Sequence, residues 1–138
     1  MGVRIEPATT ADRAAVVALW HSAGLTRPWN DPAADFDLAL ANPTSIVLLA
    51  RDGAALAGSV MAGFDGHRGW VYYLATDPVR LGQGIGKALM QAAEQWLQSL
   101  GCPRIRLMVR DDNTAARGFY SAIGYTDQAV ITMGRTLD

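Results

Sequence analysis

A glycine-rich run lies between an apolar, strand-like stretch and a long amphipathic helix, and it constrains this chain more than any other feature. The run reads Arg80-Leu81-Gly82-Gln83-Gly84-Ile85-Gly86-Lys87-Ala88-Leu89. Its three alternate glycines let the backbone turn sharply and approach a ligand closely, because they carry no Cβ. The first four N–H groups of the following helix have no intrahelical partner and carry a partial positive charge. The run therefore predicts a seat for a phosphate or pyrophosphate group.

The spacing within this run separates it from two common nucleotide-binding loops. A P-loop requires Gly, four residues and then Gly-Lys-Ser/Thr, but Leu81 stands at the first glycine position and Ala88 follows Lys87. The dinucleotide fingerprint requires glycine at position 87 and belongs near the start of a βαβ fold. Both failures argue against an NTPase and a dinucleotide-binding domain. An ordinary glycine turn at the head of a helix remains the alternative.

Composition narrows the class of protein further. The chain has 138 residues, of which 50% are hydrophobic and 18% charged, and its formal net charge is −1. This balance is typical of a single globular domain, here 1–138. It gives no basic footprint for nucleic acid, and no apolar run is long enough to span a membrane. Because the N-terminus lacks an apolar signal core, we expect a cytoplasmic protein. We expect it to be a monomer or a homodimer.

Cysteine and histidine usage argues against two further kinds of site. The single cysteine, Cys102, excludes an internal disulfide. With only His21 and His67 in the chain, a metal enzyme is not expected, and we predict no metal cofactor.

Hydrophobic periodicity predicts the order of helices and strands. The middle strands are separated by Asp-Gly turns, which predict an antiparallel meander. The strand–loop–helix–strand order over 70–110 predicts a parallel crossover. The fold class is therefore α+β (mixed α/β), a mostly antiparallel sheet with one parallel strand pair, in the order β-α-α-β-β-β-α-β-α-β. The expected strands are 3–6, 46–50, 56–64, 70–75, 104–110 and 129–135, and the expected helices are 9–23, 33–41, 85–100 and 113–122.

A second pattern lies near the C-terminus, at Asn113-Thr114-Ala115-Ala116-Arg117-Gly118-Phe119-Tyr120-Ser121-Ala122-Ile123-Gly124-Tyr125. It resembles the segment Asn-x-x-Ala-x-x-Phe-Tyr-x-x-x-Gly-Phe/Tyr of the GNAT superfamily, the acyl-CoA-dependent N-acyltransferases. The glycine run is similar to that family's cofactor loop, Arg/Gln-x-x-Gly-x-Gly/Ala. Gly84 and Gly86 fill its two glycine positions, and Leu81 departs from it at the leading Arg/Gln. The predicted element order also resembles the GNAT fold along essentially the whole chain.

The resemblance implies an N-acetyltransferase that moves the acetyl group of acetyl-CoA directly to a primary amine in a ternary complex. The acceptor would be a small molecule or a peptide. The resemblance also implies that the strands on either side of the cofactor helix splay apart around the pantetheine arm. It assigns Tyr120 as the acid that protonates the departing sulfur. The implied cofactor contacts are Leu74, Ala75, Thr76, Gly82, Gln83, Gly84, Ile85, Gly86, Lys87, Ala88 and Asn113.

The residues themselves leave simpler interpretations open. Tyr120 shares a helical face with Ala116, Phe119 and Ile123, so it could belong to a core. Asn113 is a favoured helix N-cap. No general base is evident, and Met108 stands where some relatives carry a catalytic glutamate. Deprotonating a lysine ε-amine at pH 7 costs about 4.6 kcal/mol, against about 1 kcal/mol for an α-amine, so only the former urgently needs a base.

Acceptor recognition is predicted in the linker after the first helix and in the turn at 65–69. Trp29 could line a pocket, or it could cover the core. Asp31 could attract a cationic amine, but Asn30-Asp31-Pro32 fits turn and helix-start chemistry equally well. Adjacent Tyr72 and Tyr73 are expected to face opposite sides of their strand. The sequences at 27–32 and 65–69 resemble a subgroup of small bacterial acetyltransferases, the YpeA-like proteins, without supplying a substrate. The candidate substrate residues are Trp29, Asn30, Asp31, Asp65, His67, Tyr72 and Tyr73.

Two other classes of function stay open at this point. One is a non-catalytic acyl-CoA sensor on the same fold, which the missing base favours. The other is an interaction module without a nucleotide ligand.

Overall fold

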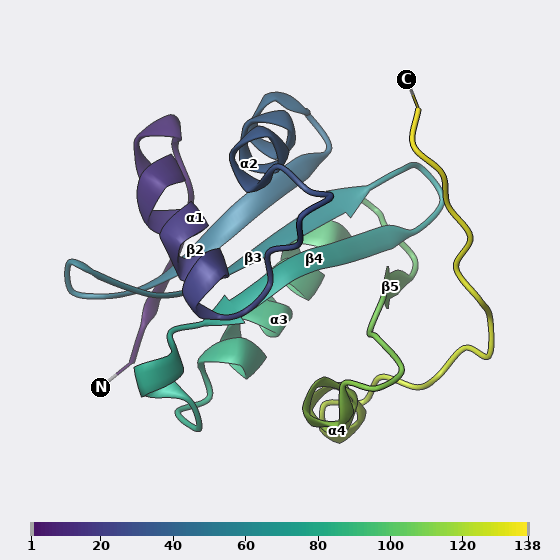
Figure 1. Ribbon diagram of the computed structural model, residues 1–138. Helices are drawn as coiled ribbons and strands as arrows, with labels where there is room; N and C mark the ends of the chain where they lie inside the picture. Colours follow the sequence, from purple (N-terminus) through teal and green to yellow (C-terminus); the bar gives the residue numbers. More distant parts are fainter. Residues whose placement is uncertain (1, 138) are drawn as a thin grey trace. The chain divides into compact units, whose positions relative to one another are not determined.

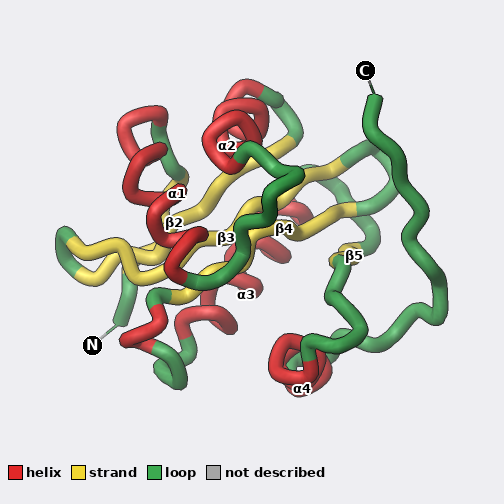
Figure 2. The backbone as a smooth tube through the Cα atoms, in the orientation of Figure 1, coloured by secondary structure: helices red, strands yellow, loops and turns green. Residues whose placement is uncertain are grey.

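The chain folds as two compact units, one ending at Met108 and the other beginning at Val109. The structure is a computed structural model that describes residues 2–137. Figure 2 shows that nearly all regular secondary structure belongs to the first unit, while the second contains one helix and a long loop.

A five-stranded sheet in the order β1-β2-β3-β4-β5 forms the centre of the first unit (Figure 1). The first four strands are antiparallel neighbours, and β5 pairs with β4 in parallel. The predicted meander and parallel crossover are confirmed, and so is the mixed α+β fold class. The strands are β1 (Arg4–Pro7), β2 (Ser45–Asp52), β3 (Ala55–Phe64), β4 (Gly69–Thr76) and β5 (Ile105–Leu107).

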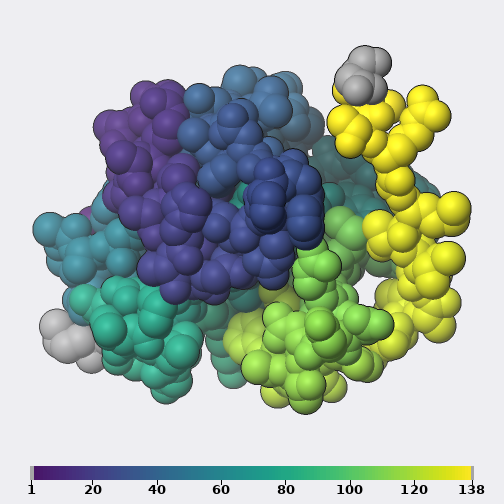
Figure 3. Space-filling view, in the orientation of Figure 1, coloured from purple at the N-terminus to yellow at the C-terminus, as the bar shows by residue number. Residues whose placement is uncertain are grey.

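Helices cover both faces of this sheet. Figure 1 shows α1 (Arg13–Ser22) and α2 (Pro32–Ala41) on one face and α3 (Ile85–Ser99) on the other. Local capping explains where the first two helical segments begin. The Thr9 amide donates to the Asp12 carboxylate at 2.8 Å ahead of α1, and the Asp31 side chain accepts the Ala34 amide at 3.1 Å at the start of α2. In Figure 3 the purple-to-blue residues of α1, the linker and α2 form a continuous surface.

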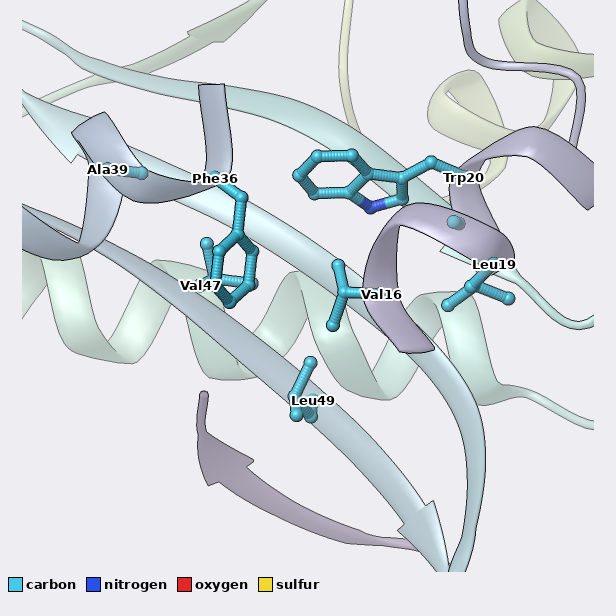
Figure 4. Packing of buried hydrophobic residues seen from close by; sticks show 8 residues of the cluster. Val16, Leu19, Trp20, Phe36, Ala39, Val47 and Leu49 are labelled. Atoms are coloured by element: carbon cyan, nitrogen blue, oxygen red, sulfur yellow. The ribbon is translucent and has the colours of Figure 1, made fainter. Parts of the chain in front are cut away.

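The core on the α1/α2 face is built around Trp20 and Phe36, both fully buried. Their rings lie at an angle of 60° with centroids 6.3 Å apart. Aliphatic side chains from α1 and β2 surround them in Figure 4, and the cluster comprises Val16, Leu19, Trp20, Phe36, Ala39, Val47, Leu49 and Ala75. We call this set the α1/α2 cluster.

Helix α3 lies unusually close to the sheet because small residues face it. A Cβ added to Gly58 would come within 2.9 Å of Ile85 and Leu89, and one added to Gly69 within 2.7 Å of Leu97. The buried residues of the helix form one stripe, through Ile85, Leu89, Ala93 and Leu97. This contact fixes the beginning of α3, and with it the glycine run.

The second unit contains one helix, α4 (Thr114–Ala122), capped by the Asn113 side chain, which accepts the Ala116 amide at 3.1 Å. The predicted strand over 129–135 is wrong, because this segment has no regular secondary structure. Ala129 has a positive φ of 56°, and Ile131 remains 84% exposed. The strand predicted over 104–110 shortens to β5 because only Ile105–Leu107 pair with β4.

Candidate functional site

The glycine run follows β4 through a short 3₁₀ turn, Pro78–Arg80. The Asp77 carboxylate caps this turn by accepting the Val79 amide at 3.1 Å. Gly82 and Gly84 then adopt φ angles of 80° and 79°, a left-handed conformation that favours glycine. A Cβ at either position would meet no atom within 4 Å. Backbone conformation therefore demands these glycines, and the space in front of them is open.

The main-chain donors of this run are not used by the fold. Within the described part of the chain, the amides of residues 82–87 donate no hydrogen bond. The next amide with a partner is that of Ala88, which donates to the Gly84 carbonyl at 3.0 Å, while before Gly82 the Arg80 amide donates to the Asp77 carbonyl at 2.8 Å. The Ala88 amide therefore differs from the amides of residues 82–87 in already having a partner within the fold. The remaining amides meet the geometric requirement of an anion seat at a helix N-terminus.

Arg80 anchors the run to the neighbouring hairpin. Its Nη1 lies 2.6 Å from Oδ2 of Asp52, and its Nε lies 3.9 Å from Oδ2 of Asp77. Leu81, which stands where the family loop carries Arg or Gln, is 69% exposed. The Arg80 guanidinium, which is next to Leu81 in the chain, is thus used in ion pairs within the fold.

The edge of β4 toward β5 is open over its second half. The parallel pairing ends at Val71–Leu107, so on that side no strand among residues 2–137 pairs with β4 beyond Val71. On the other side, the Asp77 amide donates to the Ala57 carbonyl at 2.9 Å, and Ala75 lies opposite Ser59 in the same register.

Alternation along an antiparallel ladder assigns the direction of the main-chain groups in this segment. Asp77 is hydrogen-bonded to Ala57, and Ala75 lies two residues before it in the chain. The N–H and C=O of Ala75 therefore also point toward β3. The groups of Leu74 and Thr76 then point toward the open edge. Of the three residues predicted to bind pantetheine through their main chain, Leu74 and Thr76 therefore have main-chain groups on the open side, and those of Ala75 lie in the ladder with β3.

A β-bulge interrupts β4 within this open segment. Ser59 pairs with Ala75 and Met61 pairs with Tyr72, so Tyr73 and Leu74 together oppose one residue of β3. Tyr73 has a φ of 51°, which is rare for a bulky residue. The extra residue explains why strand alternation fails at this position.

The expectation that the two tyrosines face opposite sides is wrong. Tyr72 lies opposite Met61, and Met61 packs against the α1/α2 cluster, so both occupy that face because opposed residues share a face. Tyr73 packs against the same cluster, and its ring stacks on Trp20 with centroids 3.9 Å apart and an interplanar angle of 9°. The bulge therefore places both phenols on the α1/α2 face.

Asp35 of α2 is a polar partner that the sequence analysis did not identify. The Tyr73 hydroxyl donates to its Oδ2 at 2.7 Å. Burial raises the pKa of the Tyr73 phenol, and the bond to Asp35 raises that pKa further. Burial also raises the pKa of Tyr72, with a smaller contribution from Asp65. Both phenols therefore retain their protons at neutral pH and are poor general bases.

The candidate substrate residues of the two loops make turn and cap contacts. Asp31 caps α2, the Asn30 amide donates to the Arg27 carbonyl at 3.1 Å, and Trp29 is 68% exposed. These contacts agree with the alternative of turn and helix-start chemistry. The exposed indole leaves Trp29 able to contact an acceptor.

The turn at 65–69 is organised by Asp65. Its carboxylate accepts the amides of Arg68 and His67, both at 2.8 Å, and the Trp70 indole N–H at 3.1 Å. The Arg68 and His67 amides lower the pKa of Asp65, so its carboxylate is a weak base. His67 itself is exposed.

Tyr120 lies on the packed face of α4, as its spacing predicts. Its ring makes edge contacts with Phe119 and Tyr125 at centroid distances of 5.1 and 5.8 Å. Burial raises its pKa to about 12, so its hydroxyl keeps its proton throughout the physiological range. Asn113 is the N-cap of the same helix.

Within residues 2–137, no three potential metal ligands cluster together. No helix in the same range is both long and apolar enough to cross a membrane.

Comparison with known proteins identifies the family. The model of the acetyltransferase (GNAT) family matches residues 14–125. An acetyltransferase of Pectobacterium atrosepticum is 44% identical over 126 residues, which cover 91% of this chain and 89% of that protein. One of Yersinia enterocolitica is 42% identical over 122 residues, covering 88% and 86%.

Solved structures agree on the fold. The aminoglycoside acetyltransferase AAC(6')-Iy, in complex with a bisubstrate analogue of CoA, has a TM-score of 0.85 at 15% identity over 100% of both chains. A second, from an uncultured soil metagenomic sample and in complex with sisomicin, has a TM-score of 0.82 at 18% identity, over 99% of this chain and 97% of that one. From its fold and its relatives, this chain belongs to the acetyltransferase (GNAT) family.

Proposed function

We propose that this protein is an N-acetyltransferase that moves the acetyl group of acetyl-CoA directly to a primary amine in a ternary complex. The observation that carries the proposal is the row of main-chain donors over residues 82–87, which the fold leaves unbonded at the beginning of α3. Such donors suit a pyrophosphate because the helix dipole adds to their charge. The open space before Gly82 and Gly84 fits the same ligand.

The main chain does most of the cofactor binding in this proposal. Amides from Gly82 to Lys87 hold the pyrophosphate, and Leu74 and Thr76 offer main-chain groups along the open edge of β4 to the pantetheine arm. Two or three charge-assisted contacts at roughly 1.5–3 kcal/mol each supply several kcal/mol before ordering costs. Acetyl-CoA supplies the acetyl thioester when bound.

The second unit contributes through the family motif. We assign Asn113 as a contact to the pantetheine arm and Tyr120 as the acid that delivers its phenolic proton to the departing sulfur. Its pKa of about 12 keeps the hydroxyl protonated at neutral pH, although the same shift makes the phenol a weaker acid than an exposed tyrosine. A thiol of pKa about 8.5 is already a fair leaving group, so this proton assists the reaction without being indispensable.

The acceptor is proposed to be a small-molecule amine that is partly neutral at physiological pH. Two relatives of the same fold are named as aminoglycoside acetyltransferases, which supports a small molecule over a peptide. Among the described carboxylates with displaced pKa values, those of Glu6, Asp12 and Asp65 are all lowered, which weakens them as bases. An amine of low pKa therefore fits better than a lysine ε-amine, whose deprotonation costs about 4.6 kcal/mol at pH 7.

The acceptor site is proposed on the α1/α2 face and the loops beside it. Trp29, Asn30 and Asp31 precede α2, and Asp65 and His67 lie in the turn ahead of β4. Tyr72 belongs to the same face and is 42% exposed. These residues offer an aromatic surface and carboxylate charge, the two features that bind a cationic amine.

Mass spectrometry of single turnovers with acetyl-CoA and a panel of amines tests the proposal. The panel should include aminoglycosides, amino acids and a lysine peptide, and we expect a mass increase of one acetyl group on a small amine. Cofactor binding without transfer to any amine would instead support an acyl-CoA sensor. An unchanged melting temperature at saturating CoA would support an interaction module.

A further inference from the structure

We propose that Tyr73, Trp20, Asp35 and Ser59 form an anchor that holds the β4 bulge in its left-handed conformation and thereby positions the acyl-CoA-binding edge of β4. We call these four residues the bulge anchor. The inference rests on the proposed function, because it concerns how the same cofactor edge is oriented. Tyr73 is thus assigned as a positioning residue instead of a substrate contact or base.

The bulge needs an anchor because its backbone is unfavourable by itself. Tyr73 carries a bulky side chain at a φ of 51°, a region that residues with a Cβ rarely adopt. Such a conformation persists only where surrounding contacts hold it. No glycine stands at this position to remove the strain, so the side chain must supply the restraint.

Four contacts, which involve residues of α1, α2 and β3, supply it. The Tyr73 ring stacks on Trp20 of α1 at 3.9 Å, and its hydroxyl donates to Asp35 of α2 at 2.7 Å. The Trp20 indole N–H in turn donates to Ser59 Oγ of β3 at 2.9 Å. The Ser59 hydroxyl lies 3.5 Å from the Tyr73 carbonyl, so the chain of contacts returns to the backbone of the bulge.

These contacts lie deep enough to be persistent. Trp20 and Ser59 are fully buried, and Trp20 packs on Phe36, as Figure 4 shows. The phenol and Asp35 are partly buried. A hydrogen bond to a carboxylate is stronger than one between neutral groups, so the Tyr73–Asp35 contact is the component most open to a clean test.

The bulge includes Leu74, the first of the two residues whose main chain is assigned to the cofactor. Leu74 follows Tyr73 in the chain, and its main-chain groups point toward the open edge together with those of Thr76. A rotation about φ of Tyr73 would redirect the Leu74 amide and break the register of the edge. The anchor therefore connects α2, the helix that follows the acceptor linker, to the strand that binds acyl-CoA.

A double-mutant cycle with CoA binding as readout tests the anchor. The variants are Tyr73→Phe, Asp35→Ala, their combination and Asp35→Asn, each titrated with CoA by calorimetry. We expect either single loss of the hydrogen bond to weaken CoA binding about tenfold, since the apparent Kd rises as the competent fraction falls. The double variant should be no weaker than either single one. Asp35→Asn should bind CoA almost normally, because its amide oxygen still accepts the Tyr73 hydroxyl.

Asp37→Asn is the matched control. Asp37 lies on the same helix, is exposed and pairs with Arg13 at 2.7 Å, so its neutralisation should leave CoA affinity unchanged. Amide spectra of the free protein give a second measurement, in which Leu74 and Thr76 should shift in Tyr73→Phe and not in Asp37→Asn.

The outcomes separate the anchor from the proposed function. If the unaltered protein does not bind CoA, the proposed function fails. If it binds CoA and Tyr73→Phe binds equally well with unshifted Leu74 and Thr76 amides, the anchor is refuted while the proposed function stands. A purely structural role would lower the melting temperature of Tyr73→Phe and leave its CoA affinity unchanged, which also overturns the proposal.

Discussion

Replacing Gly84 by valine tests the central claim that the glycine run is an anion seat. The position has a φ of 79°, and a Cβ there would meet no atom within 4 Å. The substitution therefore creates no steric overlap, and its cost comes from the backbone. A left-handed conformation costs roughly 1–2 kcal/mol for a residue with a Cβ, and somewhat more for a β-branched one. About 2 kcal/mol is thus the expected strain.

The chain can avoid that strain only by changing the conformation of the run. Because the amides of residues 82–87 make no hydrogen bond within the described part of the fold, little in the protein itself opposes the change. The ligand would lose the donors. Loss of two charge-assisted contacts at about 1.5–3 kcal/mol each weakens CoA binding by at least about 100-fold.

Gly101 provides a matched control at the other end of α3. Its φ is 78° and its Cβ position is equally open, so valine there imposes the same backbone cost at a distance from the seat. With an unfolding entropy of about 2.1 cal/mol/K per residue, 2 kcal/mol lowers the melting temperature by about 7 °C in a chain of this length. We expect Gly101→Val to show this shift with unchanged CoA affinity.

Calorimetric titration with CoA and thermal unfolding of Gly84→Val and Gly101→Val test whether the glycine run binds CoA. The expected pattern is a large loss of affinity in Gly84→Val alone. Wild-type affinity in Gly84→Val, alongside a destabilised Gly101→Val, would refute the assignment of the run to the cofactor. Equal losses of affinity in both variants would show that general destabilisation, not the seat, controls binding.

Three further substitutions have expected outcomes. Gly58→Ala should lower the free energy of unfolding by about 1–3 kcal/mol, because its Cβ would lie 2.8 Å from a carbonyl oxygen and 2.9 Å from α3 side chains; unchanged denaturant unfolding would contradict this packing. Arg51 lowers the pKa of Glu6 below its ordinary 4.5. The Glu6–Arg51 pair therefore adds to the free energy of unfolding above that pH, and this contribution is lost as the pH falls further. Arg51→Met should therefore flatten the fall of the melting temperature on acidification below pH 4.5, and an unaltered profile would exclude this linkage. Tyr120→Phe should reduce turnover by about 100-fold with CoA affinity retained, while wild-type turnover would return Tyr120 to a packing role.

The sequence predicted those parts of the fold whose causes are local. Helix starts depend on caps within one turn, as at Asp31 and Asn113, and both caps form. The hairpins depend on adjacent residues such as Asp52-Gly53, where Gly53 has a φ of 62°. The conformation of the glycine run belongs to the same class, because three glycines and the helix that follows determine it within a few residues.

The segment over 129–135 shows the converse. Its apolar residues predicted a strand, but a strand is stable only when a neighbour completes its ladder. Val130 is 71% exposed and Ile131 84% exposed, and a positive φ at Ala129 breaks the extended conformation. The alternation of side chains thus indicates that a segment could form a strand, but it does not show which strand would pair with it.

The orientation of Tyr72 and Tyr73 in β4 likewise depends on contacts that are distant in the sequence. Alternation would place Tyr72 and Tyr73 on opposite faces, and only the extra residue of the bulge brings both to the α1/α2 face. The contact that favours this arrangement comes from Asp35, which is 38 residues away in the chain. A row of consecutive unbonded amides, such as that over residues 82–87, can therefore be predicted from a single sequence. The orientation of the strand edge beside them depends on a distant helix, and it becomes visible only when α2 and β4 are seen together.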